Sequence, residues 1–362
     1  MSIEVDVKLK VAVLDDYHGL HKRYLGDLLD TVELTSFPDT LASTAGSQPL
    51  VSRLRPFDIL ITMRERTRLS REVITALAES SGKGGNLKVI LTTGMRNLGI
   101  DNDACKETGV ILTGTPARAL PAGTPASFNQ TVQHTWSLIL SLASNIPRDN
   151  ALLPAGQWLH ANPLNTFLAG KTLGLLGLGR LGKGTGRIAK LAFGMRVIAW
   201  SENLNQEKAD AAAVEVGLEK GDFEAVSKEE VFAQADVLSV LLLLSERTRG
   251  VVIKADLERM KPTALLVNTA RGPIIKEADL LEHLEAGKIR GAGIDVFDEE
   301  PLPLDSRWRT VKWGQEGRSE VVLTPHAGYS YEGDSGLGAM WEGLREELGR
   351  IVKGEEVKWR LA

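Results

Sequence analysis

The chain of 362 residues has little of several features that mark particular classes of protein. It has one cysteine, Cys105, so no disulfide can form within it, as is usual in a reducing compartment. Its longest apolar run lies near Val237–Leu244, far below the roughly 20 residues of a membrane helix. Its first residues lack the basic and apolar segments of a signal peptide. We therefore expect a soluble, cytoplasmic protein with no membrane partner.

The chain also lacks a strong charge of either sign, with 43 basic and 47 acidic residues. Such a balance gives no electrostatic attraction to nucleic acid, so no nucleic-acid partner is expected, and we predict no metal site. Hydrophobic residues make up 43% of the chain, an ordinary value for a globular protein. A length of 362 residues exceeds one ordinary domain and predicts two.

What the chain does have is an alternation of short apolar runs and helical patterns. The runs Val11–Asp15 and Ile59–Thr62 are typical of buried parallel strands. The segment Arg71–Glu79, preceded by Ser70 as a possible N-cap, is typical of a helix. A second series of the same kind begins at Lys171. This alternation predicts doubly wound α/β sheets.

Some stretches interrupt the alternation. The segment Gly114–Thr124 is rich in proline and glycine and predicts a hinge between domains. A long helix is expected after it, over Pro125–Leu142. The stretches Asp39–Arg55 and Arg307–Ser319 are polar and irregular, so we expect surface insertions there.

A glycine-rich motif follows the apolar run Thr172–Leu178 and opens a predicted helix. It reads GLGRLG, the G-x-G-x-x-G pattern of dinucleotide-binding loops. The first glycine permits a tight turn, the second lets the backbone approach a pyrophosphate, and the third lets helix pack on strand. The helix N-terminus adds free N–H groups and a partial positive charge. The motif therefore predicts an NAD or NADP site at Gly177, Gly179 and Gly182.

The residue that should hold the adenosine ribose is unusual. An acidic residue is expected at the end of the second strand of this series, but Ser201 stands there and Glu202 comes one place late. Ser201 could bond a ribose hydroxyl or lie beside a 2′-phosphate. No arginine adjoins it in the sequence, and Glu202 would repel a phosphate. The choice leans to NAD, with NADP left open.

Polar side chains follow three more predicted strands. Arg271 stands in the segment NTARG, Glu300 in DVFDEEP and His326 in TPHAG. An arginine matches a carboxylate with its planar fork, and a histidine exchanges a proton near neutral pH. A carboxylate beside the histidine would orient its ring and favour its protonated form. Reduction of a 2-keto acid needs these functions, so the set predicts hydride transfer at C2 of a 2-keto or 2-hydroxy acid.

These segments, in this order, resemble the D-isomer-specific 2-hydroxyacid dehydrogenase family. The similarity covers nearly the whole chain and includes VAVLDDY, MRERT, TTGMRN, GLGRLG, NTARG, DVFDEEP and TPHAG. The resemblance implies two Rossmann-like or flavodoxin-like, doubly wound parallel-sheet domains with an active-site cleft between them. It implies a substrate-binding domain of residues 1–120 plus 329–362 and an NAD(P)-binding domain of residues 121–328. It also implies a homodimer.

The resemblance further implies roles for single residues. Arg271 would bind and polarise the acid, Glu300 would pair with His326, and His326 would be the general acid/base. The backbone N–H groups of Thr93 and Gly94 would help to hold the substrate carboxylate. Cofactor contacts are implied for Gly177, Gly179, Arg180, Leu181, Gly182, Ser201, Ala270 and Asp295, the last near the nicotinamide carboxamide. Glu300, where formate dehydrogenases are expected to have glutamine, argues against formate as substrate.

Other positions depart from the family or have no assigned role. Gln133 stands where a glutamate is frequent, and Leu241 where many relatives have histidine. His134 has no partner pattern in the sequence, and Cys105 is expected to be a packed thiol. Arg64, after a strand of the first domain, could face the substrate cleft or the surface.

Two other functions stay open from the sequence. One is a nucleotide-sensing corepressor on the same scaffold, against which the chain shows no disordered charged tail for recruitment. The other is a different reductase on a Rossmann scaffold, acting for example on an amino acid. Within the main hypothesis, glyoxylate, hydroxypyruvate, other aliphatic keto acids and aryl glyoxylates are all possible substrates.

Overall fold

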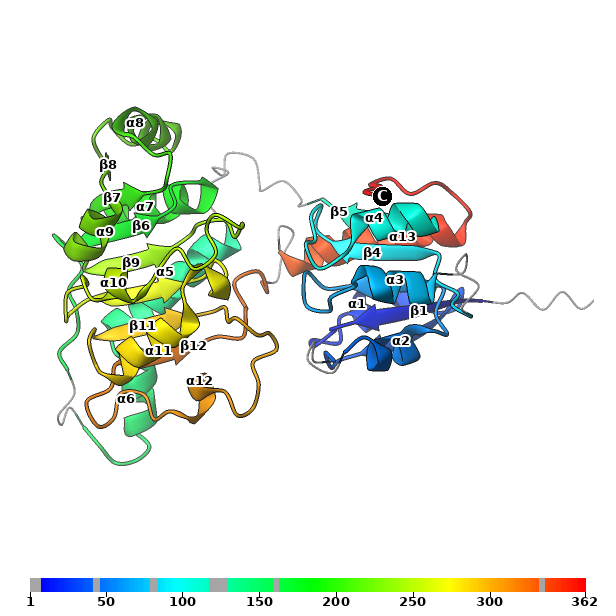
Figure 1. The fold of residues 1–362 in the computed structure, drawn as a ribbon, viewed down its shortest axis with the longest axis horizontal. Helices are drawn as coiled ribbons and strands as arrows, with labels where there is room; N and C mark the ends of the chain where they lie inside the picture. Colours follow the sequence, from blue (N-terminus) through cyan, green and yellow to red (C-terminus); the bar gives the residue numbers. More distant parts are fainter. Residues whose placement is uncertain (1–7, 42–45, 79–83, 117–128, 159–162, 332–335) are drawn as a thin grey trace, which may run out of the picture. The chain divides into compact units, whose positions relative to one another are not determined.

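The computed structural model describes residues 8–41, 46–78, 84–116, 129–158, 163–331 and 336–362. The chain divides into two compact units (Figure 1). The first unit comprises Met1–Leu120 and Tyr331–Ala362, and the second comprises Pro121–Ser330. Each contains one fully parallel sheet, so the predicted α/β class with two parallel-sheet domains is confirmed.

The first unit is built on five parallel strands in the order β2-β1-β3-β4-β5. In chain order its elements are β1 (Leu9–Leu14), α1 (His21–Tyr24), the 3₁₀ turn η1 (Gly26–Leu28), β2 (Val32–Phe37), α2 (Gln48–Leu54), β3 (Ile59–Thr62), α3 (Arg71–Leu77), β4 (Val89–Thr93), α4 (Asn102–Thr108), β5 (Ile111–Thr115) and α13 (Leu337–Val352). The strands β3 and β4 are buried throughout, because helices cover both faces of the sheet. The helix α13 returns from the end of the chain and packs on β4 and β5.

The second unit is built on seven parallel strands in the order β12-β11-β10-β9-β6-β7-β8. Its elements are α5 (Gln130–Ala143), α6 (Ile146–Leu152), β6 (Thr172–Leu176), α7 (Arg180–Phe193), β7 (Arg196–Trp200), α8 (Gln206–Glu215), β8 (Phe223–Ala225), α9 (Lys228–Gln234), β9 (Val237–Val240), α10 (Lys254–Leu257), β10 (Leu265–Asn268), the 3₁₀ turn η4 (Gly272–Ile274), α11 (Glu277–Glu285), β11 (Gly291–Ile294), α12 (Arg307–Thr310) and β12 (Glu320–Leu323). Strand order reverses between β6 and β9, and in open α/β sheets ligands bind beyond the carboxyl ends of strands at such a reversal.

Two of the predicted helices can be compared with the structure. At the start of α3, the Ser70 side chain accepts a hydrogen bond from the Val73 N–H, so the predicted N-cap is confirmed. The helix expected over Pro125–Leu142 is α5, which begins at Gln130 after the N-cap Asn129. Residues 117–128, which include most of the predicted hinge, lie outside the described residues.

The two stretches predicted as surface insertions are corrected by the structure. Within Asp39–Arg55, the helix α2 buries Leu50, Val51 and Leu54 in the core of the first unit. Within Arg307–Ser319, the side chain of Trp308 is buried in the core of the second unit. Most of their described polar residues are partly or fully exposed, so the sequence does not reveal the few apolar side chains that pack inward. None of the helices in the described parts of the chain has the length and apolar character that a membrane crossing demands.

Candidate functional site

Three polar loops lie at the carboxyl ends of adjacent strands in the second unit. The strands β10, β11 and β12 pair in register, so Asn268, Ile294 and Leu323 stand side by side at the sheet edge. The segments NTARG, DVFDEEP and TPHAG continue from these residues. The structure therefore brings Arg271, Glu300 and His326 to one edge of one sheet.

The His326 imidazole pairs directly with the Glu300 carboxylate. Nδ1 of His326 lies 2.5 Å from Oε2 of Glu300. The other carboxylate oxygen of Glu300 accepts a hydrogen bond from the Phe297 N–H at 3.0 Å, which fixes the carboxylate against its own loop. With Nδ1 facing Glu300, a proton exchanged with a ligand would pass through Nε2. The pair has the geometry of a histidine that is oriented for general acid–base work.

The loop that carries Arg271 is shaped by Asn268. The Asn268 side chain accepts from the Ala270 N–H at 3.0 Å and donates to the Arg271 carbonyl at 3.2 Å. The next residue, Gly272, packs on the DVFDEEP segment so closely that a Cβ there would lie 2.2 Å from the Phe297 carbonyl carbon. Only glycine fits, and this close approach joins the loop of Arg271 to the loop of Glu300.

The Asp295 carboxylate is turned toward the loop of His326. Asp295 is 1% exposed, and its two oxygens accept hydrogen bonds from the Thr324 hydroxyl and from the N–H groups of Ala327 and Gly328. The His134 ring, from α5, is a fourth partner at 3.1 Å. In this structure the Asp295 carboxylate thus bonds to the loop of His326. Its expected contact with the nicotinamide carboxamide stays a prediction. Sequence reasoning missed His134, because its partners lie more than 160 residues away along the chain.

The glycine loop has the form that a pyrophosphate requires. Gly177 has φ of +104°, and a Cβ there would come within 3.0 Å of the Leu241 backbone. A Cβ at Gly182 would lie 2.2 Å from the Gly177 carbonyl oxygen, whereas the space beside Gly179 is open. No side chain caps α7, so its first N–H groups, near Arg180 and Leu181, can receive an anion. These residues fit a dinucleotide.

The adenosine end of this site differs from the sequence-based picture in one respect. Ser201 follows β7, and its side-chain hydroxyl makes no hydrogen bond with the described residues. Arg247, from the loop after β9, lies 3.9 Å from the Glu202 carboxylate. An arginine does therefore approach this position through space, although none adjoins Ser201 in the sequence.

In the first unit, one expected carboxylate-binding group is already used. The Gly94 N–H donates to the Thr115 hydroxyl at 3.1 Å, and Gly94, just after β4, forms an isolated β-bridge with Thr115, the last residue of β5. The Thr93 hydroxyl accepts from the Arg64 N–H at 2.8 Å. In this structure the Gly94 N–H therefore has a partner, and the expectation that the N–H groups of Thr93 and Gly94 help to hold a substrate carboxylate stays a prediction. The next two N–H groups of the turn, on Met95 and Arg96, make no hydrogen bond among the described residues.

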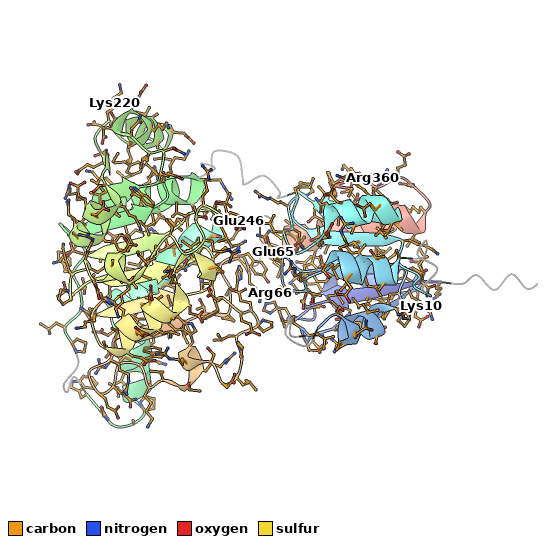
Figure 2. The ribbon with its side chains drawn as sticks, in the orientation of Figure 1. Lys10, Glu65, Arg66, Lys220, Glu246 and Arg360 are labelled. Atoms are coloured by element: carbon orange, nitrogen blue, oxygen red, sulfur yellow. The ribbon has the colours of Figure 1, made fainter. Side chains whose placement is uncertain are left out.

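The same edge of the first sheet carries further polar side chains. Arg64 has φ of 55°, and its guanidinium lies against Gly94, 3.0 Å from where a Cβ would stand. Asp15, at the end of β1, also has a left-handed backbone, and its hydroxyl partners are Thr40 and Thr67. Burial raises the pKa of the Asp15 carboxyl, although hydrogen bonds from these threonines oppose the rise. Figure 2 shows Arg66 of this edge and Lys10 at opposite ends of the sheet.

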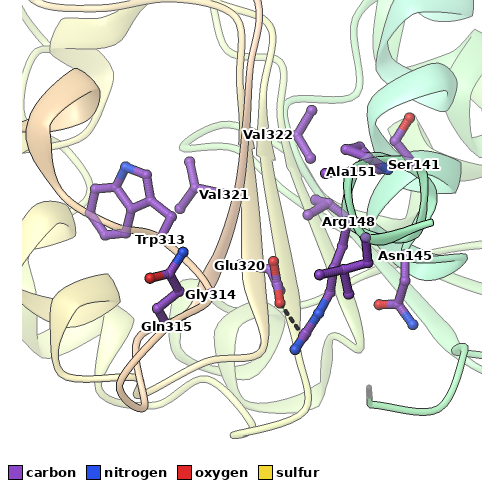
Figure 3. A pocket seen from close by; sticks show the side chains of 13 residues that line it. Ser141, Asn145, Arg148, Ala151, Trp313, Gly314, Gln315, Glu320, Val321 and Val322 are labelled. Carbon is purple, nitrogen blue, oxygen red and sulfur yellow. Dashed lines mark hydrogen bonds and ion pairs between the residues drawn. The ribbon is translucent and has the colours of Figure 1, made fainter. Parts of the chain in front are cut away.

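A separate cavity of about 330 Å³ lies in the second unit (Figure 3). Its walls come from the end of α5, from α6, from β12 and from the loop of Trp313, and an ion pair between Arg148 and Glu320 crosses it. None of the predicted site residues lines it. The cavity lies beside the strand β12, whereas His326 lies in the loop that follows this strand. The cavity is therefore separate from the loops at the carboxyl edge of the sheet.

Comparison with known proteins agrees with this geometry. Residues 136–328 match the family described as D-isomer specific 2-hydroxyacid dehydrogenase, NAD binding domain. The chain is 32% identical over 316 residues to the D-3-phosphoglycerate dehydrogenase of Methanocaldococcus jannaschii, which covers 87% of this chain and 53% of that protein. It is 30% identical over 314 residues to the glyoxylate reductase of Thermococcus litoralis, with 84% of each chain covered.

Solved structures show the same similarity. The chain superimposes on the phosphoglycerate oxidoreductase from Vibrio cholerae O395 with a TM-score of 0.78 and 30% identity, covering 96% of this chain and 99% of that one. The chain thus spans about half the length of the M. jannaschii protein (53%) and nearly all of this solved structure.

Proposed function

The chain belongs to the D-isomer specific 2-hydroxyacid dehydrogenase family, and on that premise we propose that it interconverts a small 2-keto acid and its D-2-hydroxy acid with NADH. The observation that carries the proposal is the pairing of His326 Nδ1 with Glu300 at 2.5 Å, at the same sheet edge as Arg271. The NAD-binding domain identified by its family match ends at residue 328, within this loop.

Each of these residues has a separate task. The nicotinamide, when bound, supplies or accepts a hydride at C2 of the acid. Arg271 binds the acid and polarises its carbonyl, because a guanidinium offers several donors in a fixed plane. His326 gives a proton from Nε2 to the carbonyl oxygen during reduction and takes it back during oxidation. Glu300 favours the protonated ring through its opposite charge and holds its orientation.

Within the first unit, the N–H groups of Thr93 and Gly94 stay the expected site for a carboxylate, and we add those of Met95 and Arg96 to the proposal. They follow directly on Gly94, whose own N–H is used by Thr115. Successive backbone N–H groups in a turn form a small concave site for an anion. The Arg64 guanidinium, which lies against Gly94, adds positive charge at this turn.

The substrate class rests on the relatives and stays a proposal. Those described above are named for D-3-phosphoglycerate and glyoxylate, so the acid is small and its exact identity is open. They bear enzyme names, and no feature of the described residues favours the corepressor alternative. NADH is preferred to NADPH in this proposal because Glu202 places a negative charge next to Ser201.

A homodimer is the proposed assembly. Large apolar side chains at Leu164 and Phe167 are 88% and 80% exposed, and Ile146 and Leu153 of the α6 region are each 54% exposed. Large apolar side chains that are this exposed support an association surface. A cytoplasmic location stays a prediction.

The test of the proposed function is an initial-rate screen. Purified protein is assayed for NADH and NADPH oxidation with glyoxylate, hydroxypyruvate, pyruvate, 3-phosphohydroxypyruvate and phenylglyoxylate. We expect a rate with at least one acid, and a higher kcat/KM with NADH than with NADPH. Tight NADH binding with no rate on any acid would contradict the proposal and favour a binding protein.

A further inference from the structure

His134 has no role in the proposed reaction, but it contacts residues of the loops that carry Asp295 and His326. It stands in the first half of α5 and is 8% exposed. Its Nε2 lies 3.1 Å from Oδ1 of Asp295 and 3.0 Å from the hydroxyl oxygen of Thr324. One ring nitrogen of this buried histidine therefore lies within hydrogen-bond distance of both a carboxylate and a hydroxyl.

The arrangement fixes where the proton of the ring must be. The Thr324 hydroxyl has a single hydrogen, and it is donated to Oδ1 of Asp295 at 2.6 Å. An ionised carboxylate can only accept. Nε2 of His134 must therefore carry a proton and donate toward both oxygens. His134 is thus a donor to Asp295, and Thr324 is held between them.

Asp295 in turn organises the loop of residues 324–328. Its oxygens accept from the N–H groups of Ala327 at 2.7 Å and Gly328 at 3.1 Å, and its carbonyl accepts from the His326 N–H at 2.8 Å. His326 itself has φ of 52°, a left-handed backbone that residues with a side chain rarely adopt. The loop keeps this conformation because Thr324, before His326, and Ala327 and Gly328, after it, are all hydrogen-bonded to Asp295.

The start of α5 also holds the end of the loop. The Thr131 hydroxyl donates to the Gly328 carbonyl at 3.2 Å. A Cβ at Gly328 would lie 3.1 Å from Oδ2 of Asp295 and 3.6 Å from Cδ2 of His134. One face of α5 therefore contacts the loop through two side chains one turn apart, and the loop is closely packed on that face.

We propose that His134 is a positioning residue, which acts through Asp295 to hold the 324–328 loop in the conformation that sets His326 against Glu300. This inference rests on the proposed function for its catalytic consequence, but its structural part can be tested without any substrate. A histidine that merely filled space in the core would affect the stability of the fold and leave the His326–Glu300 pair unchanged.

Two variants separate these possibilities. His134→Leu fills the space of the ring but removes the donor, and His134→Gln keeps an N–H donor at a similar reach. Proton NMR of the protein without cofactor should show a far-downfield resonance from the short His326–Glu300 hydrogen bond, assigned by its loss in His326→Ala. We expect this resonance to vanish in His134→Leu and to persist in His134→Gln. Its persistence in folded His134→Leu would overturn the proposal.

The kinetic counterpart uses the acid that gives the best rate in the screen. Loss of a hydrogen bond to a buried carboxylate should lower kcat by about 10- to 100-fold in His134→Leu, with recovery to within about threefold in His134→Gln. The Kd for NADH, measured by fluorescence, should change less than about threefold, because His134 does not form the cofactor loop.

A double variant shows whether the effect passes through His326. Adding His134→Leu to His326→Ala should cause no further loss of rate, because the group to be positioned is already gone. Losses that multiply in the double variant would contradict the inference. If no acid is reduced by the wild type, the proposed function fails, and the NMR comparison still decides whether His134 positions His326.

Discussion

The second unit contains two histidine–carboxylate pairs that differ in surroundings. The side chains of His326 and Glu300 are 16% and 24% exposed, and their atoms approach to 2.5 Å. The side chains of His134 and Asp295 are 11% and 1% exposed, and their atoms are 3.1 Å apart. The second oxygen of Glu300 accepts a hydrogen bond from the Phe297 N–H, and Asp295 accepts three hydrogen bonds from the 324–328 loop.

This difference shows what each pair can do. A partly exposed pair with a short hydrogen bond can exchange a proton with a ligand, so it suits catalysis. A buried carboxylate whose oxygens are all bonded cannot change its charge without breaking several hydrogen bonds, so it suits the holding of a backbone. The two pairs share one loop, since Asp295 bonds the residues on both sides of His326.

The largest effect should come from the exposed pair. His326→Ala removes the proposed general acid, so kcat should fall by about 10²- to 10⁴-fold while the free energy of unfolding changes little. Steady-state rates and urea denaturation measure the two quantities. The control is His283→Gln, a histidine of α11 outside these loops, for which kcat should stay within about threefold. Full activity of His326→Ala would remove the mechanism and favour another reductase.

The buried pair should affect the stability of the fold as well as the rate. Asp295→Asn places an amide donor among N–H donors, which should cost about 2 kcal/mol of unfolding free energy, or about 30-fold in the folding equilibrium. Asp305→Asn, an exposed aspartate of the same unit, should cost almost nothing. Urea denaturation at neutral pH compares them, and equal stability of the two variants would contradict the holding role.

The stability difference should also depend on pH in a stated direction. Burial acts to raise the pKa of Asp295, but hydrogen bonds from His134 and Thr324 outweigh it, and the pKa lies below the ordinary value of 3.8. A carboxyl whose pKa is depressed in the folded state stabilises the fold above its unfolded pKa. The difference between wild type and Asp295→Asn should therefore be complete above pH 3.8 and shrink as the pH falls below it.

Glu300→Gln should have a smaller effect on the rate. It keeps a hydrogen-bond partner for His326 but removes the negative charge beside the ring, so kcat should fall by about tenfold. Steady-state rates at neutral pH measure this change. A kcat equal to that of the wild type would mean that the charge of Glu300 has no part in the reaction.

A third charged pair, between Glu202 and Arg247, is mostly exposed to water. Their side chains are 65% and 75% exposed and lie 3.9 Å apart, so solvent screens the effect of either charge on a nearby ligand. Glu202→Gln removes the negative charge beside Ser201, and the ratio of kcat/KM for NADPH to that for NADH should rise about threefold. Glu207→Gln on α8 is the control, with no change expected. An unchanged or lower ratio in Glu202→Gln would show that the charge of Glu202 does not set the cofactor preference.

The sequence alone predicted the exposed pair but missed the buried one. Glu300 and His326 stand in motifs with a known order, and the strands before them are apolar runs that end at the same sheet edge. His134 lies in a long amphipathic helix, where a single histidine is indistinguishable from an ordinary core residue, and its contact with Asp295 spans 161 positions. Such contacts depend on how helix and sheet pack, which residue spacing does not encode.

The fold shows the same limit. Alternating patterns predicted β3, whose bounds Ile59–Thr62 match the structure, and the helix α3 to within a few residues. The helix α2 was missed because only three of its side chains face the core. The hydrogen bond from the Gly94 N–H to Thr115 could not be predicted either, because it depends on how two strand ends 21 residues apart lie together.

The most direct test of the central claim is to follow the hydride itself. The best keto acid from the screen is reduced with NADH deuterated at C4 of the nicotinamide, and the product is analysed by NMR and chiral chromatography. We predict that the product is the D-2-hydroxy acid with deuterium at C2. A product of L configuration, or one without deuterium at C2 from either C4-deuterated form of NADH, would contradict it.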